Sequence, residues 1–272
     1  MTDPAHILSI AGSDPSGGAG GQGDIKTFSA LGCYGMAVLS ALTAQNTLGV
    51  QAVQMVSADF VAAQIDAIFA DIRVDAVKIG MIGAAENVAA IAAQLAKHAA
   101  KNVVLDPVLV ASGGHSLGGD ELVAPIREKL FPLIRLLTPN LMESALLAGG
   151  RMPENPSDMR AMALSLHKLG APAVLIKGGH LPDGDAYDLL YDGADFTEFT
   201  SARLATRNTH GTGCMLSAAI AARLGQGADL IEAVGDAKKF LSASLAAGEF
   251  LDLGAGHGPP QPFFALWKNG GR

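Results

Sequence analysis

The sequence has few cysteines and no cluster of basic residues, and each shortage excludes a class of protein. Among its 272 residues there are only two cysteines, Cys33 and Cys214, which lie far apart and lack the spacing of metal ligands. We therefore expect neither a disulfide framework nor a zinc site, and a reducing cytoplasm fits this composition. The formal net charge is −7 and no Lys/Arg run is present, so the electrostatic footprint of a nucleic-acid-binding protein is missing.

Long apolar runs are also missing from the sequence. No apolar segment is long enough to span a bilayer, and the N-terminus lacks a basic segment before an apolar one. We therefore predict a cytoplasmic protein with no membrane partner. Hydrophobic residues make up 49% of the chain and charged residues 17%, which favours a globule with a sizeable core. No Pro/Ser/Gly-rich linker divides the chain, so residues 1–272 are predicted to form a single domain.

Short apolar segments alternate with amphipathic segments along the chain, which predicts an α/β fold with a mostly parallel sheet. Segment 50–56 has the pattern of an edge or flap strand, and segments 187–191 and 196–204 predict an antiparallel hairpin. We expect Trp267 to pack against the body. The remaining strands are expected at 6–12, 34–43, 75–80, 102–109, 136–137 and 173–180. Helices are expected at 24–31, 60–72, 86–97, 120–129, 156–169 and 230–248, and after 140 and 214.

A glycine-rich turn precedes an apolar helix at residues 208–220. Gly211 and Gly213 bracket Thr212 and leave backbone N–H groups uncovered at the start of the helix, where an anion is favoured. Cys214 follows in the first turn, where the same field favours a thiolate. The alternative is that Thr212 caps the helix and Cys214 is a small buried residue.

Residues 18–23 (GAGGQG) match the dinucleotide-binding pattern G-x-G-x-x-G literally. That fingerprint requires its first glycine directly after a strand and an acidic residue about twenty positions later. Here five residues separate Gly12 from Gly18, and the next strand leads into residues 45–47 (QNT) without an acid. We therefore interpret the loop as a wall of a ligand site, with Asp24 capping the next helix or facing the ligand.

Polar side chains follow several of the predicted strands. Asp106 stands where a buried strand ends, and in an open parallel sheet this edge forms the ligand crevice, so the carboxylate is placed for a metal or a phosphate-bearing ligand. A structural Asp-Pro turn is the alternative. Lys177 ends another buried strand and is followed by two glycines, so it would reach a transferring phosphoryl group. A solvated lysine at a strand end is the ordinary alternative.

Asn140 and Glu143 have the spacing of a capping box, in which the glutamate is structural. The alternative is a glutamate at the same crevice edge as Asp106 that helps to hold Mg²⁺ through water. The spacing favours the capping box.

Asp106, Glu143, Lys177 and the turn 211–214 thus follow four separate strands at one predicted edge. Phosphoryl transfer needs such a set, namely metal ligands, a cation, an anion hole and a base near the acceptor hydroxyl. The Walker motif G-x-x-x-x-G-K-[ST] is absent, and so are the loops of protein kinases. The chain is therefore neither a P-loop kinase nor a protein kinase.

Eight motifs together closely resemble the hydroxymethylpyrimidine/phosphomethylpyrimidine kinases of thiamine biosynthesis, which belong to the ribokinase-like superfamily. They are residues 11–20 (AGSDPSGGAG), 26–28 (KTF), 43–47 (TAQNT), 78–81 (KIGM), 105–108 (LDPV), 138–143 (TPNLME), 177–180 (KGGH) and 208–214 (NTHGTGC). The resemblance covers nearly the whole chain. It implies a three-layer α/β/α sandwich with a mostly parallel central sheet and a small antiparallel hairpin or flap.

The resemblance also implies an activity, which consists of two ATP-dependent steps in one site. The first phosphorylates the hydroxymethyl group of 4-amino-5-hydroxymethyl-2-methylpyrimidine, and the second converts the monophosphate to the diphosphate. The implied cofactors are ATP and Mg²⁺, while a monovalent cation stays open, and relatives suggest a homodimer. A pyridoxal or pyridoxine kinase of the same fold is the alternative enzyme. A ligand sensor without turnover is the alternative from another class, and the intact Lys177, Asp106 and Cys214 argue against it.

Site residues carry over position by position. The positions that match pyrimidine-binding residues are Gly12, Asp24, Gln45, Met81 and Val108, with Gln45 reading the amino and nitrogen edge of the ring. Asp106, Asn140 and Glu143 match positions near Mg²⁺ and the nucleotide phosphates, so Glu143 is expected to be both a cap and a metal residue. The matching positions of the catalytic anion hole and its cation are Gly211, Thr212, Gly213 and Lys177. Cys214 occupies the catalytic position where most of the superfamily has aspartate.

Residues 20–24 read GGQGD, whereas relatives usually read G-I-Q-A-D, so an apolar wall and a methyl group are expected to be missing beside the pyrimidine. Ala255 stands where a histidine is usual, which puts a role for that position in doubt.

The chemistry of Cys214 leaves two roles open. A thiol has an ordinary pKa near 8.5, and we expect the helix N-terminus to lower it toward neutrality, where a base is effective. We therefore hypothesise that Cys214 accepts the hydroxyl proton. Alternatively, Cys214 only aligns the alcohol, since a loose transition state for phosphoryl transfer has little need of a base that removes the hydroxyl proton.

Overall fold

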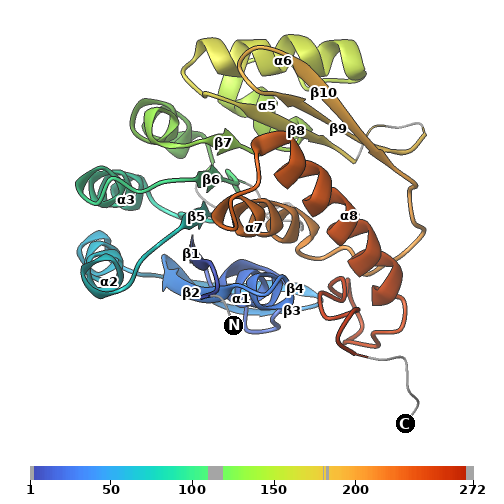
Figure 1. Cartoon of the computed structure of the whole chain (residues 1–272), viewed down its shortest axis with the longest axis horizontal. Coiled ribbons are helices and arrows are strands. Elements are labelled where there is room, and N and C mark those ends of the chain that lie inside the picture. Colours follow the sequence, from blue (N-terminus) through green and yellow to red (C-terminus); the bar gives the residue numbers. More distant parts are fainter. Residues whose placement is uncertain (1–2, 110–118, 180, 182–183, 268–272) are drawn as a thin grey trace.

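Short strands of buried aliphatic residues build a central sheet that lies between two layers of helices (Figure 1). The computed structural model describes residues 3–109, 119–179, 181 and 184–267. Within these residues, eight strands follow the spatial order β10-β9-β8-β7-β6-β5-β1-β2. They are β1 (His6–Ala11), β2 (Tyr34–Leu39), β5 (Ala76–Ile79), β6 (Val103–Leu105), β7 (Leu136–Leu137), β8 (Val174–Gly178), β9 (Ala186–Tyr191) and β10 (Phe196–Ser201).

The sheet is parallel from β2 to β8, and β9 and β10 are added to it as an antiparallel hairpin. Strands that are covered on both faces need apolar side chains on both, and this explains their nearly continuous apolar sequences. In β1, Ile7 points into one core and its neighbour Leu8 into the other. The predicted α/β fold with a mostly parallel sheet and a hairpin is confirmed.

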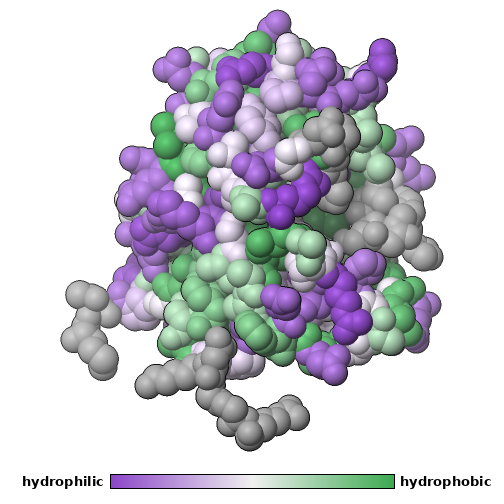
Figure 2. Space-filling view, turned by 90° about the vertical axis from the view of Figure 1, so that its right-hand side faces the viewer, coloured by the Kyte–Doolittle hydropathy of each residue, from purple (hydrophilic) through white to green (hydrophobic). Residues whose placement is uncertain are grey.

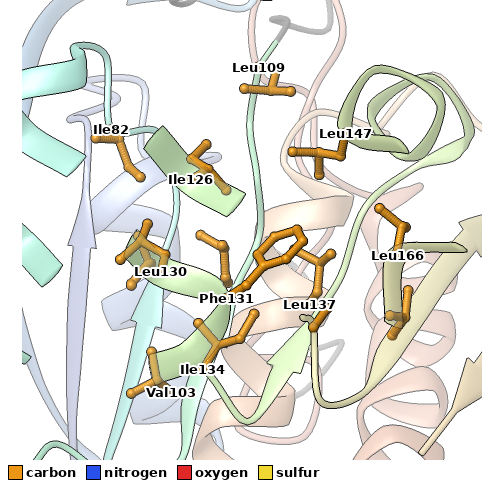
Figure 3. Close-up of a cluster of buried hydrophobic side chains, with 14 of the residues drawn as sticks. Ile82, Val103, Leu109, Ile126, Leu130, Phe131, Ile134, Leu137, Leu147 and Leu166 are labelled. Carbon is orange, nitrogen blue, oxygen red and sulfur yellow. The ribbon is translucent and has the colours of Figure 1, made fainter. Parts of the chain in front are cut away.

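Helices cover both faces of the sheet, so the expected three-layer sandwich is also confirmed. The first face carries α2 (Ala58–Asp71), α3 (Ala85–Lys97), α5 (Leu141–Ala148) and α6 (Pro156–Lys168). Figure 3 shows part of this core, where Phe131 lies among Leu130, Ile134 and Leu137. The second face carries α1 (Gly20–Ala30), α7 (Thr212–Gly225) and α8 (Leu230–Gly248).

The segment predicted as one strand at 34–43 is two strands in different sheets. β2 ends at Leu39, the chain turns at Ser40, and β3 (Ala41–Asn46) pairs with β4 (Gly49–Met55) in a separate two-stranded sheet. Ser40 holds the turn because its hydroxyl donates to the Met81 carbonyl and its own carbonyl accepts from the Val56 N–H. The continuous apolar sequence conceals this break. We call β3 and β4 together the flap.

Three other predicted elements differ from the structure, and a glycine or a proline in the backbone lies at each point of difference. The helix expected at 24–31 begins earlier, at Gly20, which has a φ of 56°. The strand expected at 102–109 stops at Leu105, before Pro107, which lacks an N–H for the ladder. The helix expected at 120–129 is a series of short turns, namely η1 (Gly119–Leu122), α4 (Val123–Pro125), η2 (Ile126–Leu130) and η3 (Phe131–Leu133), in which two prolines interrupt the hydrogen-bond ladder.

The prediction for Trp267 is wrong. Its side chain is 57% exposed and stacks on Phe263 within the same C-terminal turn rather than on the body of the molecule. Within the described residues, none of the helices combines the length and the apolar character that crossing a membrane requires. The cytoplasmic location stays a prediction.

Candidate active site

A cavity of about 510 Å³ lies at the carboxyl ends of the parallel strands. Gly12 follows β1, Met81 follows β5, Asp106 follows β6 and Gly179 follows β8, and all four line it. The flap closes one end with Gln45 and other residues, while α8 and the segment after β10 close the other. This edge of the sheet is where open α/β folds bind their ligands.

The structure brings together the predicted site residues, with one exception. Those that line the cavity are Gly12, Gln45, Met81, Asp106, Val108, Asn140, Glu143, Lys177, Gly211, Thr212, Gly213 and Cys214. The exception is Asp24, which is fully buried behind the wall. His180, which ends a predicted strand and the 177–180 motif, lies outside the described residues.

The turn before α7 has the geometry of an anion site. Gly211 is the N-cap with a φ of 79°. A Cβ at this position would overlap the Gly18 carbonyl of the loop between β1 and α1 (residues 12–19), which we call the first loop. Only glycine therefore fits, and the alternative in which Thr212 caps the helix is wrong, since Thr212 is already the first helical residue. Gly213 and Cys214 of the first turn of α7 line the cavity, and the first N–H groups of a helix have no partner within it, although the Thr212 N–H donates to the Thr209 carbonyl at 3.3 Å.

Cys214 lies in this first turn, but its ionisation differs from the expectation. Burial raises the pKa of the Cys214 thiol, and the carboxylates of Asp106 and Asp24 act in the same direction. The Lys78 ammonium and the Gly20 backbone N–H act against them without reversing the shift. The expected lowering of the pKa is wrong, because the loss of water around this partly buried residue raises the pKa by more than the Lys78 ammonium and the Gly20 N–H lower it.

Lys177 and Asp106 form an ion pair that faces the cavity. Lys177 Nζ lies 2.6 Å from Asp106 Oδ1, and the hydroxyl of Ser217 on α7 donates to Asp106 Oδ2 at 3.1 Å. Burial opposes the charged form of Lys177, yet Asp106 and Glu143 outweigh it, so the pKa of Lys177 is raised. The lysine therefore stays a cation, at a position 3.2 Å from where a Cβ on Gly213 would stand.

Glu143 forms the expected capping box and also faces the cavity, while its role toward Mg²⁺ stays a prediction. The Asn140 N–H donates to Glu143 Oε2 at 2.9 Å and the Glu143 N–H donates to Asn140 Oδ1 at 2.9 Å, which confirms the capping box. The side chain also lines the cavity. Burial raises the pKa of Glu143 to about 7, while the Lys177 ammonium opposes this and Asp106 adds to it.

A second ion pair, between Lys78 and Asp24, was not predicted. Lys78 Nζ lies 3.0 and 2.8 Å from the two oxygens of Asp24, which also accepts the Ser9 hydroxyl at 2.5 Å. Burial opposes the charge of Lys78, but the Asp24 carboxylate outweighs it and raises the pKa of the lysine. Both carboxylate oxygens of Asp24 are occupied by these partners, so the expectation that it faces the ligand is wrong. The sequence did contain a sign of this ion pair, because a lysine within the apolar strand predicted at residues 75–80 needs an anionic partner when it is buried.

The glycines that depart from the family pattern do not face the cavity either. A Cβ on Gly21 would stand 3.3 Å from Leu39 of β2, and one on Gly23 would stand 3.0 Å from the Gly18 carbonyl oxygen. The missing side chains therefore concern the packing of α1 on β2 and the first loop, and the expected gap in the wall beside the pyrimidine is wrong.

Two further polar pairs at the cavity were missed because their members lie far apart in the sequence. Lys238 of α8 lies 2.5 Å from Asp188 of β9 at one end of the cavity. His210 lies 2.7 Å from Asp14 at the flap end. In the part of the chain that the structure describes, the cavity thus combines a charged middle, a flap end with an amide, and an end lined by β9 and α8.

A family model described as phosphomethylpyrimidine kinase matches residues 14–261. The chain is 50% identical over 265 residues to a Rhizobium meliloti protein named hydroxymethylpyrimidine/phosphomethylpyrimidine kinase, with 97% of this chain and 99% of that protein covered. It is 46% identical over 262 residues to the Escherichia coli protein of the same name, with 96% and 98% covered.

Solved structures of related kinases are also similar. A phosphomethylpyrimidine kinase from Clostridium difficile 630 has a TM-score of 0.77 and 40% identity, with 87% of this chain and 97% of that chain covered. A pyridoxal kinase from Bacillus subtilis in complex with ADP has a TM-score of 0.90 and 37% identity, with 98% and 100% covered.

Proposed function

The chain belongs to the phosphomethylpyrimidine kinase family, and on this basis we propose its reaction and the roles of its residues. It is a small-molecule kinase of thiamine biosynthesis with ATP as the phosphate donor. It phosphorylates 4-amino-5-hydroxymethyl-2-methylpyrimidine to the monophosphate and then to the diphosphate.

The main observation behind the proposal is that the Lys177 ammonium lies close to the start of α7. A phosphoryl group in transfer spreads negative charge over its outer oxygens, and it needs fixed donors and a cation on that charge. The N–H groups of the turn 211–214 and the Lys177 ammonium approach one cavity edge from α7 and β8. We assign the anion hole to Gly211, Thr212 and Gly213, and the phosphate cation to Lys177.

The alcohol of the substrate is assigned to Cys214. Because burial raises the pKa of this thiol, it stays protonated at neutral pH, and this supports alignment of the alcohol over proton abstraction. The pyrimidine ring is assigned to the flap end, where Gly12, Gln45, Met81 and Val108 line the cavity. Among these residues, Gln45 supplies the polar side chain that would contact the pyrimidine ring, and the others supply apolar side chains or backbone.

Mg²⁺ is assigned to Asp106 and Glu143, with Asn140 at the nucleotide phosphates. The donor set fits, since Mg²⁺ is usually held by one or two carboxylates and takes its other oxygens from phosphates and water. Among the described residues, no group of three or more His, Cys, Asp or Glu side chains suited to a metal occurs. When bound, Mg²⁺ neutralises charge on the phosphates. A monovalent cation has no assigned residue.

The decisive experiment supplies the purified protein with ATP, Mg²⁺ and the pyrimidine alcohol, and follows the products by mass spectrometry. The monophosphate should appear first and be converted to the diphosphate. A parallel reaction with pyridoxal tests the alternative substrate. A higher kcat/KM for pyridoxal, or release of ADP without a phosphorylated pyrimidine, would overturn the assignment.

We also propose that one domain of residues 1–272 acts as a homodimer through the flap. Leu42, Leu48 and Val53 of the flap region are 47%, 74% and 42% exposed, and a two-stranded sheet is marginal in isolation. Figure 2 shows contiguous hydrophobic side chains on the lower half of the visible face, at a height where Figure 1 places both the flap and the C-terminal segment. Light scattering should give twice the chain mass, and Leu48→Glu should halve it. A monomeric parent protein would refute the dimer.

A further inference from the structure

His210 directly precedes the anion-hole turn, and its imidazole contacts the first loop. His210 Nε2 lies 2.7 Å from Asp14 Oδ2, and the same carboxylate accepts the Ala19 N–H at 2.8 Å and the Ser16 hydroxyl at 2.6 Å. Burial opposes the ionisation of Asp14, but the hydrogen bonds from His210 and Ser16 outweigh it and lower its pKa. Asp14 is therefore a carboxylate that only accepts, and the proton of this contact belongs to His210 Nε2.

The Gln45 side-chain amide meets the same ring nitrogen. In the structure the amide nitrogen lies 3.4 Å from His210 Nε2, and the amide oxygen lies 3.3 Å from Thr43 Oγ1. A 180° turn of the amide exchanges these two atoms without changing the space that they fill, so the hydrogen-bond partners decide their identity. Because His210 Nε2 carries the proton that it donates to Asp14, it offers no lone pair to an amide nitrogen, whereas an amide oxygen at this distance can share the same proton in a weaker three-centre contact.

Thr43 gives the same answer independently. Its hydroxyl has a single proton, and Thr43 Oγ1 lies 2.9 Å from the Ser13 carbonyl oxygen, which only accepts. With its proton used there, Thr43 presents a lone pair to Gln45 and requires the amide nitrogen on its side. Both neighbours therefore favour the turned amide, with its oxygen toward His210 and its nitrogen toward Thr43.

From these contacts we infer that His210 is a positioning residue that fixes the orientation of the Gln45 amide and thereby selects the ring edge of the substrate. Once His210 and Thr43 have their bonds, the amide keeps one free hydrogen on nitrogen and one free lone pair on oxygen. Gln45 lines the cavity, so these two groups are available to a ligand. They match a ring nitrogen next to an exocyclic amino group, as in a 4-aminopyrimidine, and the inference rests on the proposed function to this extent.

The position of the His210 ring is itself fixed. A Cβ on Gly18 would stand 2.6 Å from His210 Cδ2, so the ring packs against the backbone of the first loop. The His210 N–H donates to the Gly258 carbonyl at 3.0 Å, which holds the residue to the C-terminal segment. The His210 ring is therefore held in place, and so is the proton on its Nε2.

The kinetic test compares His210→Leu, which removes the N–H, with His210→Gln, whose amide nitrogen restores a donor at a similar reach. Loss of one oriented hydrogen bond should raise the KM for the pyrimidine alcohol about 10-fold in the leucine variant with kcat changed less than about 3-fold. The KM for pyridoxal, which has no amino group, should change less than about 2-fold. The glutamine variant should restore the preference for the pyrimidine. An unchanged ratio of the two KM values in His210→Leu would overturn the inference.

A second measurement does not depend on activity or on a folded variant. In protein labelled with ¹⁵N-histidine, the imidazole nitrogen shifts report which ring nitrogen carries the proton. His210 Nε2 should be protonated at pH 8, and His167 is the internal control for the opposite tautomer because its Nδ1 lies 2.9 Å from the Ala171 carbonyl oxygen. An unprotonated His210 Nε2 would refute the orientation. Absence of pyrimidine turnover in the parent protein would refute the proposed function instead.

Discussion

Two buried lysine–aspartate pairs lie at the carboxyl edge of the sheet, and they differ in what surrounds them. Lys177 and Asp106 both line the cavity, and the lysine side chain is 14% exposed. Lys78 and Asp24 are both fully buried; Lys78 borders the cavity wall, whereas Asp24 lies behind it. In the function that we propose, the same chemistry serves a ligand in the first pair and the scaffold in the second. A strand-end charge therefore indicates a site only when its surroundings include open space.

The largest expected effect is on stability and tests the pair formed by Lys78 and Asp24. Lys78→Met leaves the Asp24 carboxylate buried without its cation, so we expect a loss of about 3–5 kcal/mol in the free energy of unfolding. The double variant Lys78→Met/Asp24→Leu should recover most of this loss, because an apolar pair avoids the unpaired charge. Urea unfolding measures both. A Lys78→Met protein as stable as the parent would mean that Asp24 is not charged in the folded state.

The cavity-facing pair should respond in activity rather than in stability. Lys177→Met removes the cation assigned to the transferring phosphoryl group, and we expect kcat to fall about 100- to 1000-fold. Asp106 keeps its bond to the Ser217 hydroxyl and borders the cavity, so the loss of stability should be smaller than for Lys78→Met. Steady-state rates and urea unfolding on the same samples decide this. Equal losses of stability in the two variants would erase the proposed difference between the pairs.

Ser217 tests whether α7 supports the cavity-facing pair. Its hydroxyl is buried and donates to Asp106 Oδ2, so Ser217→Ala should cost about 1–3 kcal/mol of stability and lower kcat about 10-fold. Ser144→Ala is the matched control, because Ser144 is also a buried helix serine but donates to the Leu141 carbonyl. The control should lose stability only. A similar fall of kcat in both variants would refute a specific role for Ser217.

The smallest effect concerns the cysteine between the pairs. With the pKa of Cys214 raised by burial, the thiol stays protonated from pH 6 to 8, and kcat should show no rise from its ionisation in that interval. Cys214→Ala should lower kcat about 10-fold through poorer alignment of the alcohol, while Cys214→Ser should retain most of the rate. A pH-dependent rise of kcat that disappears in Cys214→Ser would instead support the thiolate as a base.

Local patterns in the sequence predicted the α/β alternation and the cavity edge, whereas the three-layer sandwich was predicted from the family resemblance. Apolar strands that end in Asp106 or Lys177 mark the carboxyl edge, and the spacing of Asn140 and Glu143 correctly predicts a capping box. The change of sheet at Ser40 was missed because it depends on bonds to Met81 and Val56, which are distant in the sequence.

Burial explains the other errors at the site. The pKa of Cys214 was expected to fall because the helix terminus is visible in the sequence, whereas the desolvation that raises it appears only when the loops are packed. The partners of Asp24 and Asp14 lie 54 and 196 residues away, at Lys78 and His210. No local pattern pairs such residues, so the sequence alone indicated their chemistry without their contacts.

The contact between Gly18 and Gly211 constrains how this sequence can diverge. Every single replacement of Gly211 introduces a Cβ that meets the Gly18 carbonyl, so the turn before α7 and the first loop cannot drift independently. A viable change at one position requires the backbone of the other to move in the same protein. For library design, these two loops are therefore one unit to be varied together.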